Sequence, residues 1–156
     1  MAESEETGRA TEAGVVTIRR HIEQEHGSLL AVGDFGAMLT GWRGHVANWE
    51  GAPDPFSTEL MQEGLAVATL HLSSRPKNET IAWTLLLNEP PRRLFLTGSS
   101  AEGTVTGRIL ADGAPPDGAS RLHVQVLKPR GEPHTSVTEV FGHDLLAIVE
   151  QFHTQS

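Results

Sequence analysis

The sequence contains no cysteine and no tyrosine. Without cysteine, the chain cannot form a disulfide, use a thiol nucleophile or hold zinc through thiolates. Aromatic residues make up only 5% of the chain, so its core must be built largely from leucine, valine, isoleucine and alanine. The absence of thiols is compatible with a reducing compartment, and we expect a cytoplasmic location.

Basic residues are scarce as well. Lysine and arginine number 12 against 20 aspartates and glutamates, which gives a formal net charge of −8. A phosphate backbone is bound by a basic stripe, whereas Arg92 and Arg93 form only an isolated basic pair. The composition therefore argues against a nucleic acid partner.

Long apolar runs are missing too. No run approaches the roughly 18 residues that a membrane-spanning helix needs. The N-terminal stretch "MAESEETGRATE" is polar and acidic, the reverse of a secretory signal peptide. We therefore expect no membrane partner, a disordered acidic leader over residues 1–12 and a single soluble domain over residues 13–156.

The hydrophobic pattern predicts an α+β fold of mixed or antiparallel sheets packed with amphipathic helices. Periods of two predict strands, and apolar positions at helical spacing predict helices. The expected strands cover residues 15–22 and 28–35 (a hairpin), 79–87, 92–97, 103–110, 121–128 and 136–141; the expected helices cover residues 34–49, 55–74 and 143–153.

Two of these helices carry a stripe that we expect to be buried. Asp34 is a candidate cap for the first helix, and Asp54 or Ser57 for the second. The first stripe comprises Phe35, Met38, Leu39, Trp42, Val46 and Trp49, and the second comprises Leu60, Leu65, Ala68 and Leu72.

No residue pattern indicates catalysis. The eight histidines include no H-E-x-x-H pair, so scattered surface histidines explain them better than a metal site. "GSSAEGTVTG" lacks the lysine of a phosphate-binding loop and favours a hairpin loop instead. No G-x-S-x-G nucleophile elbow is present, and Glu63 and Glu79 have no evident acid or base partner. The sequence therefore predicts a protein that is not an enzyme.

The run "ETIAWTLLL" is the most apolar part of the chain. Ile81, Trp83, Leu85 and Leu87 define one face of this strand, and the other face is also partly apolar, as expected of a central strand covered on both sides. Plain core is one interpretation. The other is an apolar sheet face that binds polypeptide, with the candidate contacts Trp83, Leu85, Leu87, Leu94, Phe95 and Leu96.

The last predicted helix carries an apolar stripe of its own. A stripe at the surface of an isolated subunit favours a contact with a second subunit. We therefore expect a homodimer whose interface includes Leu145, Ile148, Val149 and Phe152.

Several motifs resemble the N-terminal domain of the 33-kDa heat-shock protein family, the bacterial redox-regulated holdase chaperones. The segments "SRPKNETIAWT" and "LFLTGSSAEGTVTGR" look like those of a divergent branch. The closing "AIVEQFHTQS" is similar to the family's helix before its Ser-Glu-Gln signature. The resemblance covers roughly residues 14–156.

This resemblance implies an ATP-independent chaperone that holds unfolded or partly folded proteins and forms a domain-swapped dimer. In the family, a C-terminal module of four cysteines on zinc controls binding by its oxidation. This chain has no cysteine, so no zinc ligand is assigned and no cofactor is expected within it. We expect either the N-terminal domain of a longer protein or a relative without the switch. A structural or dimerisation domain that binds no client is the alternative.

Overall fold

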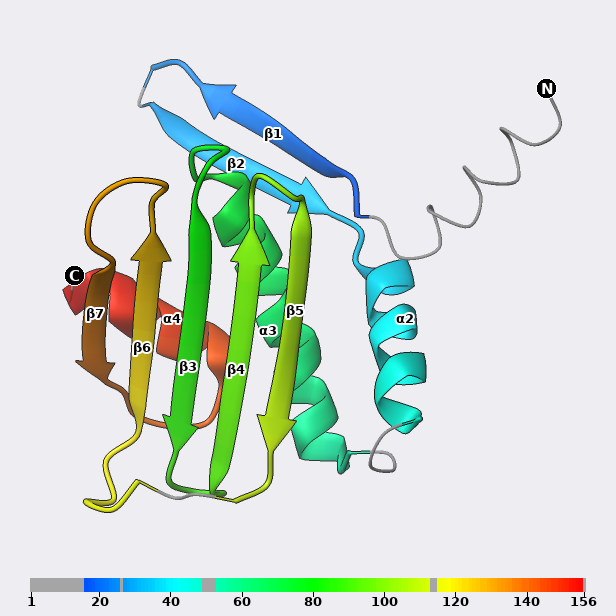
Figure 1. The fold of residues 1–156 in the computed structure, drawn as a ribbon, viewed down its shortest axis with the longest axis vertical. Coiled ribbons are helices and arrows are strands. Elements are labelled where there is room, and N and C mark those ends of the chain that lie inside the picture. Colours follow the sequence, from blue (N-terminus) through cyan, green and yellow to red (C-terminus); the bar gives the residue numbers. More distant parts are fainter. Residues whose placement is uncertain (1–15, 26, 49–52, 113–114, 156) are drawn as a thin grey trace, which may run out of the picture. The chain divides into compact units, whose positions relative to one another are not determined.

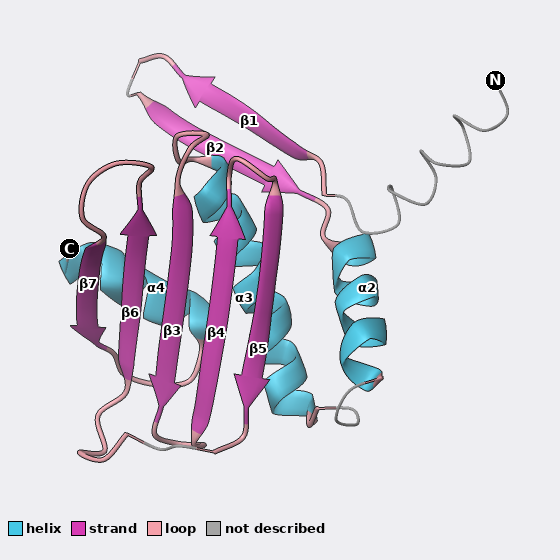
Figure 2. Ribbon diagram, viewed as in Figure 1, coloured by secondary structure: helices cyan, strands magenta, loops and turns pink. Residues whose placement is uncertain are grey.

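The computed structural model describes residues 16–25, 27–48, 53–112 and 115–155. The leader expected over residues 1–12 lies outside them, as do His26 and Trp49. The described residues form helices and two antiparallel sheets, which confirms the α+β class (Figure 2). The chain divides into two compact units, residues 1–54 and residues 55–156.

The first unit holds a hairpin and a helix. Strand β1 (Ile18–Glu23) pairs antiparallel with β2 (Ser28–Gly33), and α2 (Gly36–Ala47) follows. The hairpin and the helix confirm the expected elements. The N-cap residue of α2 is Phe35, so Asp34 is not the cap, although its carboxylate accepts a hydrogen bond of 3.0 Å from the backbone N–H of Gly36.

The buried stripe expected on α2 is wrong, because no residue of this helix is buried. Its apolar side chains, among them Met38 and Trp42, are only half-buried. A unit of one hairpin and one short helix has too few residues to bury a helix face completely.

Gly44 of α2 allows a direct test of helix propensity. A Cβ atom added there would meet nothing within 4 Å. Gly44→Ala is therefore expected to stabilise α2 by about 0.5–1 kcal/mol, because alanine loses less backbone entropy than glycine. Circular dichroism during thermal unfolding should show a later loss of helix. Gly103→Ala is the control: it also has open space, but its backbone φ of +64° should make alanine unfavourable.

The second unit contains a five-stranded sheet in the order β5-β4-β3-β6-β7, with every neighbouring pair antiparallel (Figure 1). Its strands agree with the expected ones to within two residues. They are β3 (Thr80–Leu87), β4 (Arg92–Ser99), β5 (Thr104–Leu110), β6 (Arg121–Leu127) and β7 (His134–Glu139).

Both helices of this unit lie on the same face of its sheet (Figure 1). Helix α3 (Pro55–Ser73) packs against β4 and β5, and α4 (Leu145–Gln155) crosses behind β3, β6 and β7. The core lies between the sheet and these helices. Its buried apolar residues include the predicted stripe of α3, namely Leu60, Leu65, Ala68 and Leu72.

Strand β3 is central, and among the described residues of the second unit helices cover only one of its faces. Its residues alternate between buried and half-buried along its whole length. The side chains of Ile81, Trp83, Leu85 and Leu87 are at most 3% exposed, whereas Ala82, Thr84 and Leu86 are half-buried. Within the described part of the second unit the expected cover on both sides is not found, because α3 and α4 lie on one side of the sheet.

Ser57 does not cap α3, since the helix begins two residues earlier, at Pro55. The side chain of Ser57 is buried, and its hydroxyl accepts a 2.8 Å hydrogen bond from Nε of Arg92. The bond links the first turn of α3 to the start of β4. Asp54, the other candidate cap, directly precedes the helix.

Candidate functional site

Five of the six residues predicted to bind a client lie in the core. Trp83, Leu85 and Leu87 of β3 are at most 3% exposed, and Leu94 and Leu96 of β4 are 2% exposed. All five side chains lie on the face that carries the helices. In this conformation they are out of reach of a client.

Phe95, the sixth predicted residue, lies on the opposite face and is half-buried. We call this surface the open face, because among the described residues of this unit no helix lies on it (Figure 1). The strand registers give two adjacent rows across it. They are Arg108–Phe95–Thr84–His123–Val137 and Leu110–Arg93–Leu86–Arg121–Glu139.

Apolar and basic side chains alternate on the open face. Leu86 lies opposite Arg93 on one side and Arg121 on the other, and Phe95 lies opposite Arg108. Val137, on the outer strand β7, is 53% exposed. The face therefore offers separate apolar contacts set among long polar side chains, rather than one continuous apolar patch.

Two arginines of the open face are bound to carboxylates at its margin. Arg93 lies 2.7 Å from Asp112. Arg121 forms two hydrogen bonds to the carboxylate of Asp117, and this contact lowers the pKa of Asp117 and raises that of Arg121. These pairs hold the guanidinium groups in place, so that their alkyl chains lie beside the apolar residues.

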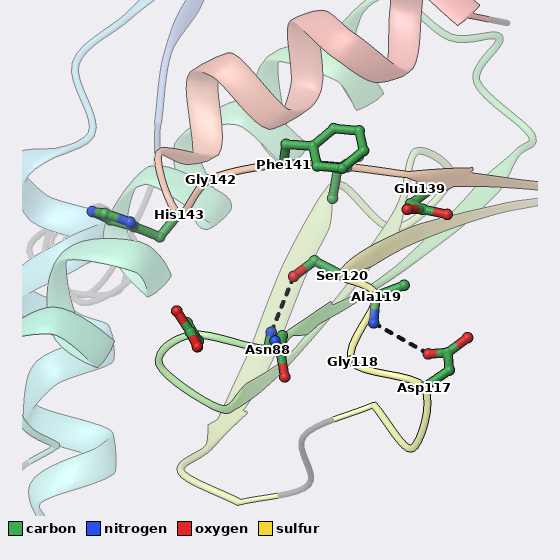
Figure 3. Close-up of a pocket in the computed structure, with 11 residues that line it drawn as sticks. Asn88, Asp117, Gly118, Ala119, Ser120, Glu139, Phe141, Gly142 and His143 are labelled. Carbon is green, nitrogen blue, oxygen red and sulfur yellow. Dashed lines mark hydrogen bonds between the residues drawn. The ribbon is translucent and has the colours of Figure 1, made fainter.

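A hollow of about 470 Å³ lies at one end of the sheet, where three connecting segments meet (Figure 3). Asn88 donates its backbone N–H to Ser120 (3.0 Å), and Asp117 accepts from the N–H of Ala119 (3.2 Å). The carboxylates of Glu89, Asp117 and Glu139 give the hollow an acidic lining. Glu139 belongs to both the hollow and the open face.

Phe141, at the edge of this hollow, is 69% exposed. Gln151 of α4 holds its backbone with two hydrogen bonds. The side-chain oxygen accepts from the Phe141 N–H at 2.8 Å, and the side-chain nitrogen donates to the Phe141 carbonyl at 3.0 Å. A large apolar ring is thereby kept at the surface, and no pattern in the sequence indicated it.

The residues predicted for a dimer interface serve the core of the chain itself. Leu145, Ile148 and Phe152 are at most 6% exposed, and Val149 is half-buried. The stripe on α4 is explained by packing within the second unit, so it gives no support for a contact with a second subunit. Leu146, on the other side of the helix, is 58% exposed.

Asp144 accepts a hydrogen bond of 3.0 Å from the N–H of Leu146, as expected for an acidic residue at a helix start. Its charge also acts on Glu63 of α3. Partial burial raises the pKa of Glu63, and the carboxylates of Asp144 and Glu59 raise it further.

Glu79 has a partner that the sequence did not reveal. Its carboxylate is 2.7 Å from Nε of Arg75, four residues earlier, and the residue is only 4% exposed. The turn that carries this pair is tied to the next hairpin by Ser100, whose hydroxyl bonds the carbonyls of Pro76 and Glu79. The "GSSAEG" segment is a hairpin loop, with Ser99 accepting from the N–H of Glu102 at 3.3 Å.

Two of the described histidines, His71 and His153, lie close together. The ring of His71 on α3 lies 5.3 Å from the indole of Trp83 and 6.1 Å from the ring of His153 on α4, measured between centroids. The pKa of His71 is lowered to about 4, mainly by burial and in smaller part by the charges of Arg75 and His153, while Glu79 acts in the opposite direction. In the described part of the chain, no group of three or more histidines and carboxylates is arranged to hold a metal ion.

A scan against models of known protein families and a search of curated proteins find no match for this chain. No helix among the described residues is long and apolar enough to cross a membrane.

Proposed function

We propose that the second unit binds unfolded or partly folded polypeptides through the open face, as an ATP-independent, non-enzymatic holdase of the cytoplasm. One observation carries the proposal: the sheet has helices on one face, and the other face presents Phe95, Leu86 and Val137 among polar side chains. The resemblance of "SRPKNETIAWT" to the heat-shock family points to the same activity. The client surface proposed here is the face opposite most of the residues first predicted.

Such a surface suits clients of many sequences. Burying one phenylalanine or leucine side chain contributes about 1.5–3 kcal/mol without directional chemistry. The arginines beside Leu86 and Phe95 can donate hydrogen bonds to client carbonyls. The net charge of −8 helps to keep a loaded complex in solution.

Suppression of thermal aggregation tests the proposal. At a few molar equivalents over an unrelated client, the protein is expected to reduce light scattering. Phe95→Glu is expected to weaken client affinity roughly tenfold or more, because it removes an apolar contact and adds a charge that must lose water. Thr97→Glu is the matched control, since it adds the same charge to an exposed position of the same strand and face.

The proposal fails if the unsubstituted protein leaves scattering unchanged. The open face is rejected as the client surface if Phe95→Glu suppresses aggregation as well as the unsubstituted protein does. Circular dichroism must first show that both variants keep the secondary structure of the parent.

The alternative is a structural domain whose open face joins two subunits. The paired rows of side chains across a five-stranded sheet favour it, because two such faces can pack on each other. This function predicts a dimer in sedimentation that Phe95→Glu dissociates, together with no effect on client scattering. The two assays therefore separate the two functions.

A further inference from the structure

His71 sits where three separate elements meet. It projects from the last turns of α3 toward Trp83 of β3 and His153 of α4, with ring centroids 5.3 and 6.1 Å away. Next to His153, the ring of Phe152 is 6% exposed and belongs to the core. The C-terminal half of α4 is therefore packed beside an imidazole that can change its charge.

The charges around His71 disfavour its protonated form. Arg75 lies four residues further on, just beyond the end of α3, His153 faces the ring from α4, and Glu79 lies just before β3. Glu79 is the one carboxylate among these neighbours, and it is bound to Arg75 at 2.7 Å. Nε2 of His71 is buried and has no hydrogen-bond partner among the described residues. A proton on this ring would meet two basic groups and gain no acceptor there.

We propose that protonation of His71 releases the C-terminal half of α4 from α3 and β3, so that acid opens this side of the second unit. Movement of α4 carries His153 away from the new charge and lets water reach the His71 ring. Both changes stabilise the imidazolium, and neither requires β3 or β4 to leave the sheet.

The direction of the pH effect follows from the pKa of His71, which burial, together with the smaller effects of Arg75 and His153, lowers from an ordinary 6.5 to about 4. The closed form binds the proton less well than the opened form. The attachment of α4 is therefore fully stable above pH 6.5 and weakens as the pH falls toward 4. Between pH 6.5 and pH 5, the equilibrium constant for opening is expected to rise by about 15-fold, for one proton with a pKa of about 4 in the closed form and 6.5 in the opened form.

Opening would also expose the apolar residues that α4 covers, such as Phe152 of α4 itself and Trp83 beside His71. Acid would then give the protein a second client surface, on the face where five of the predicted client residues lie. This consequence rests on the proposed holdase function, whereas the release of α4 does not.

Hydrogen exchange read by mass spectrometry tests the release without any client. Protection of the α4 amides, corrected for the intrinsic effect of pH, is expected to fall by about 15-fold from pH 6.5 to pH 5, with protection of β4 unchanged. His71→Phe keeps a ring in place but cannot take up a proton, so its α4 should stay protected at both values. His134→Phe, an exposed position on β7, is the matched control and should respond as the parent does.

Constant protection of α4 across this range would overturn the proposal. A loss of α4 protection in His71→Phe equal to that of the parent would overturn it as well. If that variant does not fold, His71→Gln replaces it with the same expected result. Light scattering at pH 7 and pH 5 then tests the consequence. If α4 is released by acid but no client is bound at either pH, the proposed release stands and the holdase function is rejected.

Discussion

Leu85→Ala is expected to lower the free energy of unfolding of the second unit by about 2–5 kcal/mol. The side chain of Leu85 is 1% exposed, on the central strand and beneath the helices. Its truncation removes apolar contacts and leaves a cavity that a five-stranded sheet cannot close by a small shift. Urea unfolding followed by circular dichroism measures the change.

Leu86→Ala is the matched control, because it is the same substitution at the next position of the same strand. Leu86 is half-buried on the open face, so we expect its loss to cost about 1 kcal/mol or less. It should instead weaken suppression of client aggregation. Equal destabilisation by the two variants would contradict a sheet whose core lies on one face only.

Gly107→Ala is expected to destabilise the second unit by about 1–3 kcal/mol. Gly107 lies on β5 beneath α3, and a Cβ atom there would overlap the ends of Met61 and Leu96 and approach the carbonyl oxygen of Phe95 to 2.7 Å. The side chains can turn away in part, but the backbone oxygen cannot. The same urea measurement detects the effect.

Thr106→Ala is the control for this prediction, since Thr106 is the exposed neighbour of Gly107 on the same strand. We expect a change within about 0.5 kcal/mol, as at other surface positions. If Gly107→Ala were as mild, α3 could not be packed against β5 as closely as the structure places it.

The strands and helices could be predicted from the sequence because each depends on a local period. Alternation in "TIAWTLLL" and helical spacing in "ELMQEGLAVATLHL" identify elements without reference to their neighbours. Which side of the sheet a helix covers depends instead on how the chain connects the elements. These connections produce no periodic pattern in the sequence. Trp83 and Leu85 were therefore identified as a face of the sheet, but could not be assigned to the core rather than to a client surface.

The same limit applies to α4 and to the charged groups. A stripe such as Leu145, Ile148 and Phe152 has the same spacing whether it packs within its own chain or on another subunit. His71 and His153 come together only because α3 and α4 lie on one face, and the two positions are far apart in the sequence. Glu79 and Arg75 are four residues apart, but their pairing across a turn has no simple sequence signal.

The position of β6 beside β3 has a consequence for the order in which the second unit folds. Strands β3, β4 and β5 are joined by short turns, as are β6 and β7, so each group can form through local contacts. The pairing of Thr80 with Leu127 closes a much longer loop and costs more chain entropy. The β3–β4–β5 meander should thus precede the docking of the β6–β7 hairpin, and this late step should limit the folding rate.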